Sequence, residues 1–207
     1  MSTGPSVVLH NVRWHTYEAL LADRGDRGPR IFYDQGTLEI MSPSWKHERL
    51  KTLIGRLIEA FSEELDIDIS AGGATTLKSQ LRARGLEPDE SYYVQNEPRV
   101  REKDAIDLTV DPPPDLAIEV DVFGTSVAKL EVYASLGVPE LWSHDGKGLV
   151  VRQLQATGTY VMVNRSAAFP MLPLQELDGF LNQMDTLSDT KIGRAFRAWV
   201  RERFGTR

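Results

Sequence analysis

Cysteine is absent from the 207-residue chain, and this absence excludes several kinds of chemistry at once. Without thiols the chain cannot form disulfides, a thiolate nucleophile or a cysteine-ligated zinc or iron–sulfur site. An excess of basic residues is also lacking, because 24 lysines and arginines stand against 30 aspartates and glutamates, for a net charge of −6. A protein that coats nucleic acid through its overall charge is normally basic, so this balance counts against that role.

Long apolar runs, repeats and low-complexity linkers are lacking as well. No stretch approaches the length that a helix needs to cross a bilayer. Residues 1–10 hold no basic segment followed by an apolar one, so we expect no signal peptide, no contact with membranes and a soluble, cytoplasmic protein. The chain length suits one domain with a sizeable core, and we expect a single domain over residues 1–207.

Helices and strands are predicted in a mixed order along the chain. The clearest helix covers residues 44–65, where apolar residues recur at helical spacing and form one wide stripe. Residues 116–122 are predicted to form a buried central strand, because they are apolar and β-branched apart from two acidic residues. Antiparallel hairpins and one helical crossover favour an α/β (α+β) fold, with a mixed sheet flanked by helices. The other predicted helices are 14–22, 126–136 and 190–204, and the other predicted strands are 31–33, 38–41, 91–94, 106–110, 139–143, 149–154 and 159–163.

Two acidic residues have positions that suggest chemistry. Glu119 interrupts the apolar strand 116–122, and a buried carboxylate is costly unless it is paired or bound to a metal. Asp89 follows a proline at the start of a predicted strand, where turn formation is the alternative explanation. If neighbouring strands bring both carboxylates together with the Val120 carbonyl, the oxygen atoms would form a site for Mg²⁺ or Mn²⁺. For Glu119 the alternative is a structural carboxylate that is satisfied by a basic neighbour.

Lys129 is the candidate for the basic group of such a site. It lies three residues into the predicted helix 126–136 and shares a helical face with apolar residues, so it is expected to point inward. An amine at this place would orient a water molecule or offset negative charge on a reacting phosphate. A metal would polarise the phosphate and activate the water. The alternative is a lysine whose stem covers apolar surface while its amine reaches water.

Glu39 and His47 form a second candidate cluster. Glu39 alternates with the apolar face of strand 38–41, and His47 lies in the first turn of helix 44–65, on its inward side. Because helix N-termini attract phosphate, His47 is predicted to contact a phosphate or to assist acid–base chemistry. A structural role near the helix cap is the alternative for this histidine.

Basic and aromatic side chains elsewhere offer a further route to nucleic acid. The basic face of helix 190–204 would follow a nucleic-acid backbone, or it is simply solvated. Trp45, Trp142 and Tyr133 are candidates for stacking on bases, although core packing is favoured for Trp142 and Tyr133. The basic residues of that helix are Lys191, Arg194, Arg197, Arg201 and Arg203.

A set of short motifs, taken in order, resembles one protein family. In sequence letters they are MSPS at 41–44 followed by His47, GLEPDESYY at 85–93, DPPPDLAIEVD at 111–121, Lys129 with Tyr133, and GVPELW at 137–142. Over about residues 14–185 they resemble the Uma2 family of the PD-(D/E)XK nuclease superfamily. The resemblance implies a restriction-endonuclease-like core, a divalent-metal site for Mg²⁺ or Mn²⁺, DNA as the substrate and a homodimer.

The same resemblance assigns roles to individual residues. Asp89 matches the aspartate of the PD motif, and Glu119 matches the acidic residue of the second motif. The lysine of that motif would fall at Asp121, and we infer that Lys129 takes its role. The expected function is therefore a metal-dependent DNA endonuclease in which Glu39 or His47 assists. The alternative is an inactive module of the same fold that binds nucleic acid or a protein partner.

Overall fold

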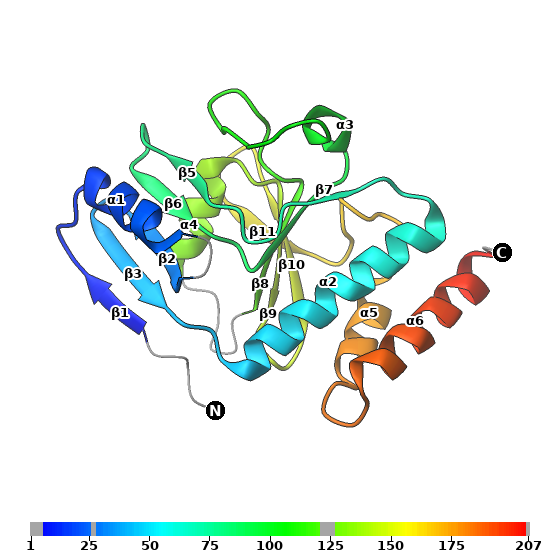
Figure 1. The fold of residues 1–207 in the computed structure, drawn as a ribbon. Helices are drawn as coiled ribbons and strands as arrows, with labels where there is room; N and C mark the ends of the chain where they lie inside the picture. Colours follow the sequence, from blue (N-terminus) through cyan, green and yellow to red (C-terminus); the bar gives the residue numbers. More distant parts are fainter. Residues whose placement is uncertain (1–5, 26–27, 121–126, 206–207) are drawn as a thin grey trace.

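Two β-sheets and the helices that cover them make up the computed structural model, which describes residues 6–25, 28–120 and 127–205 (Figure 1). The six-stranded sheet has the order β11 (Tyr160–Val163), β10 (Leu149–Leu154), β9 (Glu140–His144), β8 (Leu116–Val120), β7 (Glu90–Tyr93) and β4 (Ser70–Ala71). The five-stranded sheet has the order β1 (Ser6–Leu9), β3 (Thr37–Met41), β2 (Arg30–Asp34), β6 (Arg84–Leu86) and β5 (Leu77–Ser79). Among the described strands only β8 and β9 pair in parallel, so the larger sheet is mixed, as predicted.

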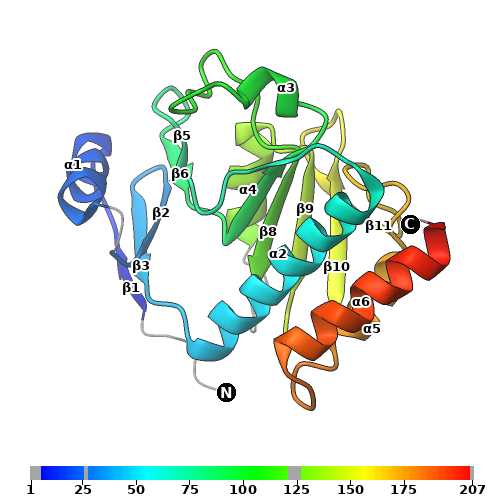
Figure 2. The ribbon, with the colours of Figure 1, turned by 45° about the vertical axis from the view of Figure 1, so that its right-hand side comes forward.

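Three helices cover one face of the six-stranded sheet (Figure 1, Figure 2). They are α2 (Trp45–Leu65), α5 (Leu174–Leu181) and α6 (Asp189–Phe204). The side chain of Ser44 caps α2 by accepting a hydrogen bond from the His47 N–H, which fixes where the helix begins. The predicted apolar stripe of α2 is buried against the sheet, and each such side chain stabilises the fold by roughly 1.5–3 kcal/mol. The stripe includes Leu50, Leu53, Ile54, Leu57, Ile58 and Phe61.

Helix α4 (Val127–Leu136) connects the parallel strands β8 and β9 and lies between the two sheets. Its buried residues Val132 and Tyr133 pack in one cluster with Phe32 of the smaller sheet and Ala117 of the larger one. The helix ends at Gly137, whose φ of 81° is a conformation that favours glycine. This packing holds the two sheets at a fixed distance from one another.

The smaller sheet has its own cover and its own cluster. Helix α1 (Trp14–Arg24) packs on it through Tyr17, whose ring stacks on Tyr33 with centroids 4.9 Å apart. The short helix α3 (Glu97–Val100) follows β7. No helix of the described ranges is both long enough and apolar enough to span a bilayer.

Most predicted elements are found within a few residues of their expected bounds, with one clear exception. Residues 106–110 form turns and not the predicted strand. Asp107 explains the difference, because its side chain accepts a hydrogen bond from the Thr109 N–H at 2.9 Å and its carbonyl accepts one from the Asp111 N–H at 2.7 Å. The predicted strand 116–122 is observed to Val120, and the remaining two residues lie outside the described part of the chain. The elements that were not predicted are β1, β4, β5, β6, α3 and α5.

Candidate active site

Antiparallel pairing of β7 with β8 brings Asp89 and Glu119 to one place. The Asp89 N–H donates to the Ile118 carbonyl at 3.0 Å, and the Val120 N–H donates to Oδ2 of Asp89 at 2.6 Å. Both carboxylates line one small cavity, which is also lined by Lys129 from α4. The backbone of two adjacent strands therefore fixes the position of both acidic side chains.

Asp89 is 3% exposed and has two further groups around its carboxylate. Nε2 of His47 donates to Oδ2 at 2.9 Å, and Nη1 of Arg30 lies 3.1 Å from Oδ1. Burial alone would raise the pKa of Asp89, but the hydrogen bond from His47 and the charge of Arg30 hold this pKa below its ordinary value. Burial opposes protonation of His47 most strongly, yet the hydrogen bond to Asp89 and the charge of Asp89 together outweigh it, so the pKa of the imidazole is raised. Asp89 is therefore an anion that is enclosed by cationic groups.

Glu119 is 2% exposed and is held by two side chains of α4. Nζ of Lys129 donates to Oε2 at 2.8 Å, and the Tyr133 hydroxyl donates to Oε1. Burial raises the pKa of Glu119, the charge of Lys129 opposes the rise, and the charge of nearby Asp89 adds to it. Glu119 thus senses the charge of Asp89, as expected of two acidic groups that share one site.

Four of the five predicted site side chains meet here. Asp89, Glu119 and Lys129 line the cavity, and His47 reaches it through its bond to Asp89. Glu39 does not, because it lines no part of the cavity and joins none of the hydrogen bonds given above, although it pairs with Phe32, which does line the cavity. Asp121, which stands at the expected position of the motif lysine, lies outside the described residues.

Two residues of the site were missed by the sequence analysis. Arg30 was not singled out, because a lone arginine at the start of a strand of the other sheet gives no signal of its own. Tyr133 was expected to pack in the core; it does, and its hydroxyl also contacts Glu119. Its spacing of four residues from Lys129 on one helix was the available signal.

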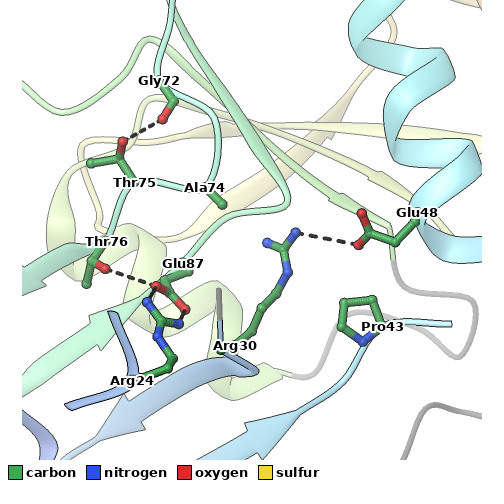
Figure 3. Close-up of a pocket in the computed structure, with 10 residues that line it drawn as sticks. Arg24, Arg30, Pro43, Glu48, Gly72, Ala74, Thr75, Thr76 and Glu87 are labelled. Atoms are coloured by element: carbon green, nitrogen blue, oxygen red, sulfur yellow. Dashed lines mark hydrogen bonds and ion pairs between the residues drawn. The ribbon is translucent and has the colours of Figure 1, made fainter. Parts of the chain in front are cut away.

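A buried ion pair stands beside the site and ties the smaller sheet to it (Figure 3). Both carboxylate oxygens of Glu87 accept hydrogen bonds from the Arg24 guanidinium, at 2.6 Å each. Oε2 of Glu87 also accepts from the Ile31 N–H at 3.1 Å, and Oε1 accepts from the Thr76 hydroxyl at 3.1 Å. This carboxylate is fully occupied, so we assign it a structural role.

An open cleft of about 660 Å³ lies outside the small cavity. Arg30 and Glu87 line both spaces, so the cleft adjoins the two-carboxylate cavity. Figure 3 shows Arg30 extending between the Arg24–Glu87 pair on one side and Glu48 with Pro43 on the other. A substrate that occupied the cleft would thus lie next to Asp89 and Glu119.

The residues of the inner cavity fit a hard divalent cation. Its volume of about 10 Å³ is close to the lower limit for one water molecule, and a small ion occupies no more space than that. Each carboxylate has about four acceptor positions, and their present donors leave some of these open. Oxygen donors of this kind suit Mg²⁺ or Mn²⁺. Within the described ranges no group of three or more histidine, aspartate or glutamate side chains could hold a metal, so the site relies on two carboxylates.

The basic face of α6 is partly used within the protein. Arg197 forms ion pairs with Glu63 and Glu64 of α2, and Arg201 pairs with Glu64. Both arginines keep part of their side chains in solvent, so a solvated face remains the favoured interpretation, and a role in binding nucleic acid stays a prediction. Of the candidate stacking residues, Trp142 and Tyr133 are buried, as favoured, and only Trp45 is exposed.

Comparisons with known proteins agree with this architecture. The profile of the Uma2 family, described as "Putative restriction endonuclease", matches residues 14–184. A solved structure described as a "putative nuclease belonging to DUF820 from Anabaena variabilis ATCC 29413" is similar, with a TM-score of 0.57 and 16% identity, over 82% of this chain and 99% of that one. At that identity the likeness shows the fold alone, and it confirms the restriction-endonuclease-like architecture. No curated protein matches the chain significantly.

Proposed function

Because the chain belongs to the Uma2 family, we propose that it is a metal-dependent DNA endonuclease that acts through Asp89, Glu119 and Lys129. One observation carries the proposal: two buried carboxylates from adjacent strands line one water-sized cavity together with an amine. Such a group of charges is costly to bury without a function, because each ion loses its hydration. Perturbed acidic groups beside a cleft are typical of catalytic sites.

Asp89 and Glu119 would hold Mg²⁺ or Mn²⁺, with the Val120 carbonyl as a third protein oxygen. When bound, the ion would polarise a phosphate oxygen and lower the pKa of a water molecule. The strands fix both carboxylates before any ligand arrives, because the Asp89 N–H and the Val120 N–H are engaged across β7 and β8.

Lys129 is placed to act on the nucleophile or on the phosphate. Its amine already lies 2.8 Å from Glu119, so a water molecule or phosphate oxygen at that carboxylate would be within reach of the same amine. A cation here offsets the negative charge that develops on the phosphate in the transition state. Because the lysine comes from α4 and not from the strand, its position rests on the packing of that helix between the two sheets.

His47 is a positioning residue in this proposal. It touches Asp89 and no part of the cavity, so it would hold the carboxylate in place and would not transfer a proton to substrate. Glu39 contacts none of these groups, and we assign it no step.

A cleavage assay tests the function directly. Purified protein would be incubated with supercoiled, linear and single-stranded DNA in Mg²⁺, in Mn²⁺ and in a chelator. We expect cleavage of at least one DNA form with a divalent ion, no cleavage with chelator, and none by Asp89→Asn or Glu119→Gln. A wild-type protein that leaves all three forms intact in both ions would refute the proposal.

The inactive module stays the second candidate, and one observation favours it. Arg30, His47 and Lys129 already enclose the two carboxylates, so the site is electrically satisfied by the protein itself. Calorimetric titration with Mn²⁺ separates the two candidates, because an endonuclease of the proposed type binds the ion and loses that binding in Glu119→Gln. Light scattering would test the homodimer, which stays a prediction.

A further inference from the structure

Trp45 is 82% exposed, and it is the one aromatic side chain among the large exposed apolar residues of the described ranges. It is the first residue of α2, where the Ser44 cap and the bond from the Glu48 N–H to the Ser44 carbonyl at 3.0 Å fix the backbone. The indole is therefore presented to solvent from a rigid position. Single exposed apolar residues are common, so the surroundings of this one decide its meaning.

Trp45 does not line the open cleft itself, but residues on both sides of it in the sequence do, which places it next to the rim of that cleft. Glu48 lies one helical turn further along α2 and is thus its neighbour on the helix surface. Glu48 and Pro43, which flank Trp45 in the sequence, both line the cleft (Figure 3). His47 of the same helical turn reaches Asp89, so the rim and the inner cavity are joined by one short segment of chain.

Arg30 lies at the inner end of the same cleft. Its Nη1 is used by Asp89 and by the Pro88 carbonyl. Within the described part of the chain, its Nη2 forms an ion pair with Glu48 at 3.8 Å, which is beyond hydrogen-bond distance. No described residue accepts a hydrogen bond from Nη2, so this end of the guanidinium remains available to an anion in the cleft. Arginine suits phosphate, because its planar fork of N–H groups matches the phosphate oxygens.

The opposite wall of the cleft is made of small residues. Gly72, Ala74, Thr75 and Thr76 line it, and they add no aromatic or long cationic side chain. One side of the cleft thus carries Arg30 and the chain neighbours of the exposed Trp45, while the other leaves room for a chain to pass. This is the composition expected of a groove for a single nucleic-acid strand, in which bases stack on aromatic rings and cations follow the phosphates.

We propose that Trp45 and Arg30 form a subsite for one unpaired nucleotide, whose base stacks on the indole and whose phosphate binds Nη2 of Arg30. The inference rests on the proposed function and narrows its substrate to single-stranded or locally opened nucleic acid. A continuous duplex hides the faces of its bases, so it cannot use Trp45 in this way. Stacking needs no excess of positive charge, which agrees with the net charge of −6.

Binding in a chelator tests the subsite without any catalysis. The probes are a fluorescently labelled oligothymidylate and a relaxed, covalently closed circular duplex. We expect Trp45→Ala to weaken oligothymidylate binding by about tenfold, from the loss of one stacked base, and Trp45→Phe to keep most of the affinity. Binding of the closed duplex should be the same in all three proteins. Leu81→Ala is the matched control, because Leu81 is 97% exposed and lines no part of the cleft.

Intrinsic fluorescence gives a second readout of the same contact. Oligothymidylate should quench the tryptophan emission of the wild type, and the quenching should disappear in Trp45→Phe while binding persists. Arg30→Lys should weaken oligothymidylate binding, because the fork that faces the cleft is lost. Thermal melting would verify that each variant is folded.

Several outcomes would overturn the subsite. They are unchanged oligothymidylate binding in Trp45→Ala, an equal loss for the closed duplex, or a Trp45-dependent self-association in light scattering in place of DNA binding. The failure of the nuclease proposal would look different. A wild-type protein that binds oligothymidylate through Trp45 but cleaves nothing would keep the subsite and lose the endonuclease, whereas DNA cleavage without any effect of Trp45→Ala would do the reverse.

Discussion

Buried carboxylates occur in two settings on the six-stranded sheet, and their partners differ in kind. Glu140 on β9 is 1% exposed, and neutral donors satisfy it: the Trp142 indole N–H at 2.6 Å, the Ser166 hydroxyl and backbone N–H groups. Asp115, just before β8, is likewise held by the Val94 N–H and by the backbone and side chain of Asn96. Asp89 and Glu119 are held mainly by Arg30, His47 and Lys129.

The difference separates a structural acid from a candidate catalytic one. Neutral hydrogen-bond donors bind a carboxylate without a charge that an arriving cation could replace. Because they are packed closely around the carboxylate, they also leave no space for a ligand. Cations on flexible stems neutralise an anion but can move when another cation arrives. Burial alone therefore does not mark a site, and Glu87 shows that a cationic partner beside a cleft does not either, because its acceptor positions are all filled. Asp89 and Glu119 combine burial, cationic partners and open acceptor positions. The predictions below test this contrast, from the largest expected effect to the smallest.

The largest effect is expected on DNA cleavage. Asp89→Asn and Glu119→Gln keep the shape of each side chain but remove its charge, so a cation would no longer be held. We expect cleavage to fall by on the order of a thousandfold, about 4 kcal/mol in the activation barrier. The matched control is Glu140→Gln, which should leave the rate per folded molecule unchanged. Equal losses in all three variants would remove the distinction between the two settings.

Glu140→Ala should instead damage stability. The change leaves the Trp142 N–H and neighbouring donors buried without an acceptor, at a cost of about 3 kcal/mol in the free energy of unfolding. For a chain of this size such a loss lowers the melting temperature by roughly 10 °C. Thermal and urea melts of the purified variant would measure it. A melting temperature within a degree or two of the wild type would mean that these neutral donors contribute little.

Lys129→Met tests whether the cations at the site are exchangeable. Among the described residues, removing the amine leaves Glu119 buried with the Tyr133 hydroxyl as its donor. We therefore expect a loss of about 2 kcal/mol in unfolding free energy, reduced from the fully buried case because the lysine is partly exposed. Added Mn²⁺ should then raise the melting temperature of this variant more than that of the wild type. If Mn²⁺ stabilises both proteins equally, Lys129 does not compete for that position.

Tyr133→Phe tests the same contrast with a smaller expected effect, because it removes one neutral hydrogen-bond donor from Glu119. We expect a loss of about 1 kcal/mol in stability and a fall in cleavage of less than about tenfold. A thermal melt and a cleavage time course would measure the two quantities. A fall as large as that of Glu119→Gln would instead give the hydroxyl a direct part in the reaction.

The smallest effect is expected for the ion pairs between α6 and α2. Arg201→Ala removes contacts of an exposed arginine to Glu64, and solvent screening makes such surface pairs contribute little to stability. Urea melts at low and high salt would measure it, and the wild-type advantage should shrink as salt is added. A loss that persists at high salt would point to packing of the arginine stem and not to charge.

Local patterns predicted much of the fold and the centre of the site. The position of Glu119 in an apolar strand, the proline before Asp89 and the helical face of Lys129 made them candidates, the family resemblance assigned them to one site, and the structure brings them to one cavity. These three residues lie on adjacent elements, so short-range rules apply. The long helix was predicted from its period, and the structure shows Ser44 as its cap.

Long-range pairing explains what could not be predicted. Arg30 reaches Asp89 only because the smaller sheet packs against the larger one, and no local pattern specifies that arrangement. Glu39 has the right alternation, but alternation gives the face of a strand and not the distance to a site. The short strands β4, β5 and β6 are held in place by pairing with neighbouring strands. They could not be predicted, because two or three residues are too few to show a strand pattern.

Arg30 belongs to the smaller sheet, whereas Asp89, which it contacts, belongs to the larger one. The site is therefore complete only when the two sheets are packed against each other. If the smaller sheet separated from the larger one, the Arg30 guanidinium would move away from Asp89, while the six-stranded sheet and the helices that cover it stayed folded. DNA cleavage would then be lost in mild denaturant, before the main loss of the helical signal. Hydrogen exchange should accordingly find β2 less protected than β8.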